Sequence, residues 1–175
     1  VSDVDRIVVE NSLTKSNLNL SKDAETKEVM LLSIILKKQD FDGKIVEAIA
    51  RQNPHKLIFH LCFEEKRQLA VYHSKLYRTD WIPEDKVRLS LSGDNLDAIW
   101  DDLVQQVAVH SEAVLGQEGK TIDDQLKMQD EIDRLNKLIR KTETVAWKEQ
   151  QPKKRFKLYT RLQEYKRQLK EITNG

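Results

Sequence analysis

The chain is poor in the residues that build disulfide frameworks, flexible linkers and membrane spans. It has one cysteine, Cys62, so an intramolecular disulfide cannot form, and this fits a reducing, cytoplasmic location. Only five glycines and three prolines occur among 175 residues, which favours an ordered chain made mostly of regular elements. The apolar runs all fall short of the roughly 18–20 residues that span a bilayer, so we expect no membrane association.

Motifs for common catalytic sites are also missing. The glycines form neither a phosphate-binding loop nor a dinucleotide-binding pattern, and the serine-elbow motif does not occur. A restriction-type nuclease triplet ending at Lys37 would need an acidic residue where Ile35 stands. His60, Cys62 and His73 alternate on predicted neighbouring strands, but these three lack a fourth ligand at motif spacing. We therefore predict no catalytic residues, no metal site and no cofactor.

The most apolar part of the chain predicts a strand, a helix and a β-hairpin in succession. Residues 29–36 form an almost unbroken apolar run, typical of a central strand buried on both faces. The helix that follows is expected to end before Pro54, because proline pushes the preceding residue out of the helical region. Residues 57–63 and 69–72 alternate as two strands, with a turn predicted over residues 64–67.

A second predicted helix closes this first part of the chain. Apolar residues from Leu96 to Val107 form one stripe, and we expect the helix to run to about Leu115 and to pack on the sheet. Gly116 and Gly119 bracket a linker, after which glycine is absent up to Ile172. We predict a core domain over residues 1–116, a linker over 117–120 and a helical region over 121–175.

The helical region carries two apolar seams at coiled-coil spacing. The seams comprise Met128, Ile132, Leu135, Ile139, Thr142 and Ala146, and then Leu158, Leu162, Tyr165, Leu169 and Ile172. They are interrupted near Pro152, which predicts an antiparallel helical hairpin. The predicted fold class is α+β, with a mixed, mostly antiparallel sheet, packed helices and this C-terminal coiled coil. Pairing of the seams between two chains, giving a homodimer, is the alternative.

Charge is segregated along the chain although the formal net charge is only +1. Residues 81–133 hold 13 acidic and four basic residues, whereas residues 134–170 hold 13 basic and three acidic ones. Trp147, Phe156 and Tyr159 lie among the basic residues, and such aromatic side chains can stack on unpaired bases. The candidate binding residues for DNA or for an acidic protein partner are Lys148, Lys153, Lys154, Arg155, Lys157, Arg161, Lys166 and Arg167. The competing interpretation is a solvated coiled-coil face, with Phe156 and Tyr159 packing on the first helix of the hairpin or on the core domain.

The chain resembles a bacterial and archaeal family catalogued as a domain of unknown function. The resemblance covers most of the chain and is carried by residues 29–38, 43–50, 57–61, 69–72, 77–81 and 91–99. It departs from the family pattern at Asn53-Pro54, where an Ile-Pro pair is expected. The resemblance implies a genomic neighbourhood of restriction-type helicases and adenine-specific DNA methyltransferases, and it supplies no catalytic residues.

From these observations we expect a non-catalytic accessory or interaction protein of a bacterial restriction or phage-defence system. Its basic hairpin would contact DNA or a helicase or methyltransferase partner. One alternative is a metal-dependent enzyme acting on nucleic acid, with carboxylates supplied from before Val1 or by Asp80, Glu84 and Asp85. The other alternative is a coiled-coil self-assembly module.

Overall fold

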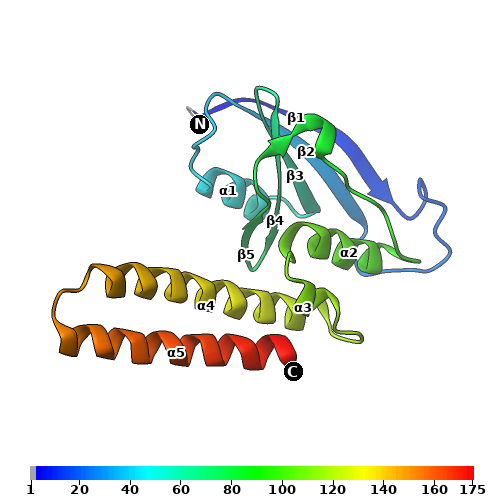
Figure 1. Ribbon diagram of the computed structural model, residues 1–175. Helices are drawn as coiled ribbons and strands as arrows, with labels where there is room; N and C mark the ends of the chain where they lie inside the picture. Colours follow the sequence, from blue (N-terminus) through cyan, green and yellow to red (C-terminus); the bar gives the residue numbers. More distant parts are fainter. Residues whose placement is uncertain (1–2) are drawn as a thin grey trace. The chain divides into compact units, whose positions relative to one another are not determined.

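The computed structural model describes residues 3–175 and divides the chain into two compact units (Figure 1). The first unit extends to Ala108 and the second begins at Val109. This boundary falls ahead of the glycine-bracketed segment 117–120.

The first unit is built on one mixed sheet of six strands. Its strands are β1 (Val4–Thr14), β2 (Glu28–Leu36), β3 (Lys56–Phe63), β4 (Lys66–His73), β5 (Lys75–Arg78) and the short β6 (Ile82–Pro83). The order is β1-β2-β3-β4-β5, with β6 pairing on β4. Only β2 and β3 are parallel and every other pairing is antiparallel, which confirms the predicted mixed, mostly antiparallel sheet.

The parallel pair requires a crossover, and helix α1 (Lys44–Gln52) supplies it. Val46 of α1 is fully buried in a cluster that includes Leu32, Ile34 and Phe59 of the sheet. The helix ends at Gln52, and Asn53 before the proline is extended, as the sequence predicted.

The other face of the sheet is covered by α2 (Leu96–Ala108). Val29 and Ile58, at the alternate strand positions, are each 1% exposed and line a small cavity together with Leu103 of α2. Burial on both faces explains the continuous apolar run of β2. The amide oxygen of Asn95 accepts a hydrogen bond from the Ala98 backbone N–H at 2.9 Å and begins the helix.

The prediction that this helix continues to Leu115 is wrong. The helix stops at Ala108, and a separate short helix, α3 (Glu112–Leu115), follows. The backbone N–H groups of His110 and Ser111 donate to the side-chain oxygen of Gln129, at 3.2 and 3.0 Å. A buried side chain thus takes the donors that a continuous helix would have used, a long-range effect that local sequence does not reveal.

The turn between β3 and β4 is also shorter than predicted. Phe63 pairs with Lys66, so only Glu64 and Glu65 remain in the turn instead of residues 64–67. Glu64 has a φ of 50°, the left-handed conformation that two-residue hairpin turns require. The strand pairing therefore shifts by two residues from the predicted register, which changes the partners of every residue on β4.

The second unit is dominated by a helical hairpin of α4 (Ile122–Lys148) and α5 (Pro152–Asn174), which run antiparallel side by side (Figure 1). The hydroxyl oxygen of Thr121 accepts from the Asp124 N–H at 3.2 Å and caps α4. The seam residues Leu135 and Leu162 are 0% and 4% exposed, so the seams pair within one chain. Among the described residues, no helix combines the length and the apolarity needed to cross a membrane.

Candidate functional site

The tip of the hairpin is a tight connection with its own hydrogen bonds. Lys148 ends α4, residues 149–151 cross over, and Pro152 begins α5 at a position where a missing N–H costs nothing. The Glu149 carboxylate accepts from the Gln151 N–H at 2.8 Å, and the Glu149 carbonyl accepts from Arg155 Nε at 2.9 Å. These hydrogen bonds hold the connection between the two helices in a defined conformation.

Aromatic side chains at this tip project into solvent. Trp147 is 84% exposed, Phe156 73% and Tyr159 43%. Phe156 stands two positions before the seam residue Leu158, so it points to nearly the opposite side of α5. This exposure does not favour the interpretation that Phe156 and Tyr159 pack on the first helix of the hairpin. Large exposed aromatic side chains gathered at one end of a helical hairpin commonly mark a contact surface.

Most of the predicted basic residues lie at the same tip with their charges uncompensated. Five exposed cations of the tip form neither an ion pair nor a side-chain hydrogen bond with the described residues: Lys148, Lys153, Lys154, Lys157 and Arg161. Arg155 is also exposed and bonds only a backbone carbonyl through Nε. We call these cations, together with Trp147, Phe156 and Tyr159, the tip surface.

Two of the predicted residues belong to a different setting farther along α5. Lys166 forms an ion pair with Glu143 across the hairpin at 2.8 Å. Arg167 binds Glu164 at 2.7 Å and also contacts Glu171. The hydrogen bonds from Arg167 and then Gln168 lower the pKa of Glu164 to about 2, and the same Glu164 contact raises the pKa of Arg167. These cations are already matched by acids, so we exclude them from the tip surface.

Glu164 and Glu171 lie three positions before and four positions after Arg167, and this spacing is visible in the sequence. It could have identified Arg167 as a cation with acidic partners on its own helix.

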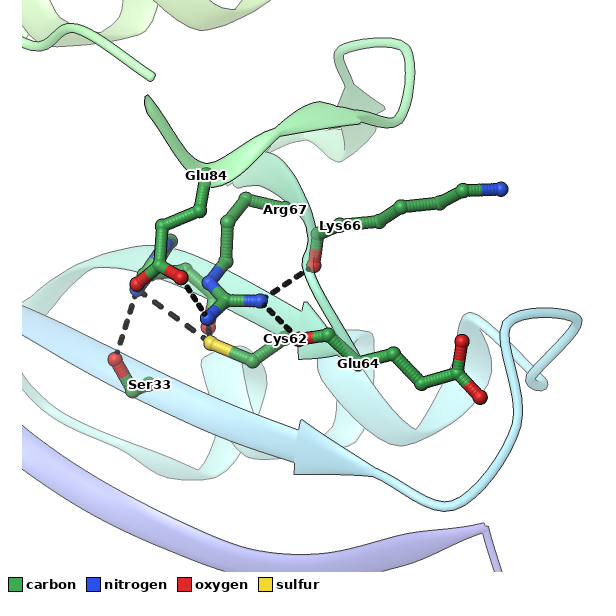
Figure 2. Close-up of polar contacts among 7 residues, drawn as sticks. Ser33, Cys62, Glu64, Lys66, Arg67 and Glu84 are labelled. Carbon is green, nitrogen blue, oxygen red and sulfur yellow. Dashed lines mark hydrogen bonds and ion pairs between the residues drawn. The ribbon is translucent and has the colours of Figure 1, made fainter. Parts of the chain in front are cut away.

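A polar cluster lies on the α2 side of the sheet, at the β3–β4 turn (Figure 2). Ser33 Oγ lies 3.0 Å from His60 Nδ1, and Cys62 Sγ lies 3.6 Å from the same nitrogen. The register places Ser33 beside His60 and Ile35 beside Cys62, so strands β2 and β3 bring these groups together. Sequence reasoning had paired His60 with Cys62 but did not find Ser33, which reads as part of an apolar strand.

Arg67 anchors this cluster to the hairpin turn. Figure 2 shows its guanidinium between Glu84, 2.8 Å away, and the carbonyls of Glu64 and Lys66, which accept at 2.7 and 2.9 Å. Burial, with a further contribution from the nearby Arg67 charge, lowers the pKa of His60. Burial also raises the pKa of the Cys62 thiol.

The Cys62 thiol and the Ser33 hydroxyl of this cluster are poorly suited to attack a substrate. A thiol whose pKa is raised stays protonated at neutral pH and is a poor nucleophile. Ser33 is 1% exposed, so its hydroxyl is not accessible to a substrate. The polar groups join β2, β3 and β4 at the turn end of the sheet, and only the Nε atom of Arg67 is buried there without a hydrogen-bond partner among the described residues.

The other residues considered for metal or enzyme chemistry lie apart. His73 shares the sheet face of His60. The shorter turn, with the register extended along the strands, places His73 opposite residue 56, which is four positions before His60 on β3. Glu84 is engaged by Arg67, and Asp85 lies 4.0 Å from Lys86. Within residues 3–175, groups of three His, Cys, Asp or Glu side chains suited to a metal ion do not occur.

Comparison with known proteins identifies a family for nearly the whole chain. Neither a curated protein nor a solved structure matches the sequence. A family model matches residues 1–169, which include both units and the tip surface. The chain therefore belongs to the family described as Domain of unknown function (DUF4391).

Proposed function

We propose that this protein is a non-catalytic nucleic-acid-binding protein that holds single-stranded segments on the tip surface. The observation that carries the proposal is the exposure of Trp147 and Phe156, at 84% and 73%, among cations that have no acidic partner. Phosphates attract free cations through counterion release, and exposed aromatic rings stack on unpaired bases. A duplex would offer phosphates but few exposed base faces.

Sites that bind single strands combine these two elements and rarely need sequence-specific hydrogen bonds. The tip surface supplies five free cations and three aromatic rings within the last turn of α4, the connection and the first turns of α5. In the biological setting, we infer that the protein serves a restriction or phage-defence system, in which helicases expose single strands.

The test is a salt titration of binding to a labelled oligo-thymidine strand and to a duplex of equal length. If all five free cations contact phosphates, the slope of log K against log salt is about −3.5 on the single strand. A variant with Lys153, Lys154, Lys157 and Arg161 changed to Gln removes four of these cations, and its slope is expected to be shallower than that of the unmodified protein by about 2.8. The matched control changes Lys86, Arg88, Lys120 and Lys127 to Gln, which removes the same charge from exposed positions outside the tip.

Tight single-strand binding that the tip variant loses and the control keeps supports the proposal. Equal loss in both variants would reduce the effect to net charge, and absence of binding in the unmodified protein would overturn the proposal. In that last case the tip surface would be tested against an acidic protein partner, starting with helicases and adenine-specific methyltransferases. A pull-down with the tip variant as the negative control decides that question.

A further inference from the structure

The outer strand of the sheet, β1, has a free edge with exposed apolar residues in its middle. It is the terminal strand in the order β1-β2-β3-β4-β5 and pairs only with β2. Its consecutive residues Ile7, Val8 and Val9 are 48%, 37% and 56% exposed. Soluble proteins usually protect such edges with charges, proline or a covering element, because an exposed strand edge recruits another strand.

Both ends of β1 are irregular or already hydrogen-bonded, so only the middle of its edge is open to pairing with another strand. The side chain of Asn17 bonds the Thr14 N–H at 2.8 Å and the Ser12 carbonyl at 2.5 Å. Breaks in the register with β2 occur between Val4 and Arg6 and between Val9 and Asn11, as in β-bulges. The regular, unprotected stretch therefore runs from Arg6 to Val9.

The direction of the backbone groups follows from the register. Ser12 faces the outer edge, since Asn17 bonds it there. In an antiparallel strand, the backbone N–H and C=O groups of successive residues point alternately to the two sides of the strand. Followed from Ser12 along the register and across the bulge, this alternation points the backbone groups of Ile7 and Val9 to the outer edge. These two residues therefore offer free N–H and C=O groups to an incoming strand, whereas Val8 faces β2.

The sequence of this stretch is complementary to itself. If two copies pair antiparallel about a two-fold axis at Val8, Ile7 of each copy lies opposite Val9 of the other, and Arg6 lies opposite Glu10. The side chains of Arg6 and Glu10 form no ion pair and no hydrogen bond within the described residues, so both charges are available. Val8 would face its own symmetry mate.

The apolar residues Ile7 and Val9 lie on one face of the sheet, and the charged residues Arg6 and Glu10 lie on the other. Ile7 and Val9 pair with Ile34 and Leu32, so they lie on the α1 face, where Ile7 borders an open apolar groove with Val4, Ile45 and Ile49. This groove has a volume of about 430 Å³. Val9 of a second copy, seated opposite Ile7, would extend apolar contact over it. Arg6 and Val8 lie on the other face, and the Glu10 charge acts on His60 and Cys62, which also lie on that face.

We propose that the β1 edge is an interaction surface for a second copy of this chain, paired antiparallel about a two-fold axis at Val8. The contact is short, since bulges bound it on both sides. We therefore expect a weak dimer in rapid exchange with monomer. It joins the cores through the sheet edge and leaves the helical hairpin seam within each chain.

The first experiment is sedimentation equilibrium over a range of protein concentrations with charge-swap variants. Arg6→Glu and Glu10→Arg each place like charges opposite one another twice across the axis, and each is expected to weaken the dimer roughly tenfold. The double variant Arg6→Glu/Glu10→Arg restores both pairs and is expected to recover the dimer. Monomer at every concentration, or a double variant weaker than both single ones, would overturn the proposal.

A cross-linking experiment tests the register directly. In a Cys62→Ser background, Val8→Cys places the two thiols in a pair without backbone hydrogen bonds, where Cα atoms lie about 4.5 Å apart and a disulfide can form. Val9→Cys is the matched control, because that position lies opposite Ile7 of the second copy. Oxidation should give covalent dimer for Val8→Cys only. Equal cross-linking at both positions would refute the register, and none at either would refute the contact.

Discussion

Removal of the two most exposed aromatic rings at the hairpin tip should separate stacking from electrostatic attraction. Trp147 and Phe156 are 84% and 73% exposed, so replacing either with Ala should change the free energy of unfolding by less than about 0.5 kcal/mol. Stacking of a base on an aromatic side chain contributes about 1–3 kcal/mol. We therefore expect each single substitution to raise the Kd for a single strand by roughly five- to 150-fold.

The same variants should leave the salt dependence unchanged, because a stacked base releases no counterions. The slope on a single strand should stay near −3.5 while the whole line moves to weaker binding. Fluorescence anisotropy of a labelled oligo-thymidine strand measures both quantities in one titration. Val145→Ala is the matched control, since Val145 is 44% exposed near the same tip but has no ring.

Two outcomes would refute this reasoning. If Trp147→Ala and Phe156→Ala bind as tightly as the unmodified protein, the rings do not stack on bases and their exposure needs another explanation. If Val145→Ala weakens binding as much as the ring substitutions, general apolar contact accounts for the effect. Intrinsic fluorescence provides an independent check, because Trp147 is open to solvent whereas Trp100 is 4% exposed and Trp81 is partly buried.

Three further predictions concern stability. Leu162 is the buried residue of α5, at 4% exposure, and Leu162→Ala should lower the free energy of unfolding by about 2–4 kcal/mol. Urea denaturation measures this loss, and Gln163→Ala, at an exposed position, is the control. Gln129→Leu leaves the His110 and Ser111 N–H groups without their acceptor and should cost about 1–3 kcal/mol in the same assay, whereas an unchanged midpoint would contradict the capping role. Burial lowers the pKa of His60 below its usual 6.5, so the unfolded chain takes up this proton more readily than the folded one. Stability should accordingly fall as pH drops below 6.5, and His60→Asn should flatten that part of the profile; an unaltered profile would exclude His60 as its source.

Local pattern predicted the elements whose burial is periodic. The apolar run of residues 29–36 predicted β2, the alternation after it predicted β3 and β4, and the heptad seams predicted the hairpin of α4 and α5. Pro54 correctly marked the end of α1, because the effect of proline on its neighbour is local. The cations of the tip surface were named from sequence for the same reason, since charge density along a helix is readable without a fold.

The failures have long-range causes. The break after Ala108 depends on Gln129, 18 and 19 positions beyond the N–H groups that it binds. Ser33 joins His60 only because β2 and β3 pair in parallel, a register that neither strand specifies alone. The shorter β3–β4 turn depends on Glu64 adopting a left-handed conformation, which glutamate seldom does.

Composition and periodicity by themselves determined the α+β class, the helical hairpin and the segregation of charge, because each reflects how single residues partition between water and an apolar interior. Tertiary structure decided which of those residues are available for binding. It left Trp147 and Phe156 exposed, matched Lys166 with Glu143 across the hairpin, and made β1 the open edge of the sheet. Exposure and pairing depend on neighbours distant in sequence, which is why the fold had to fix them.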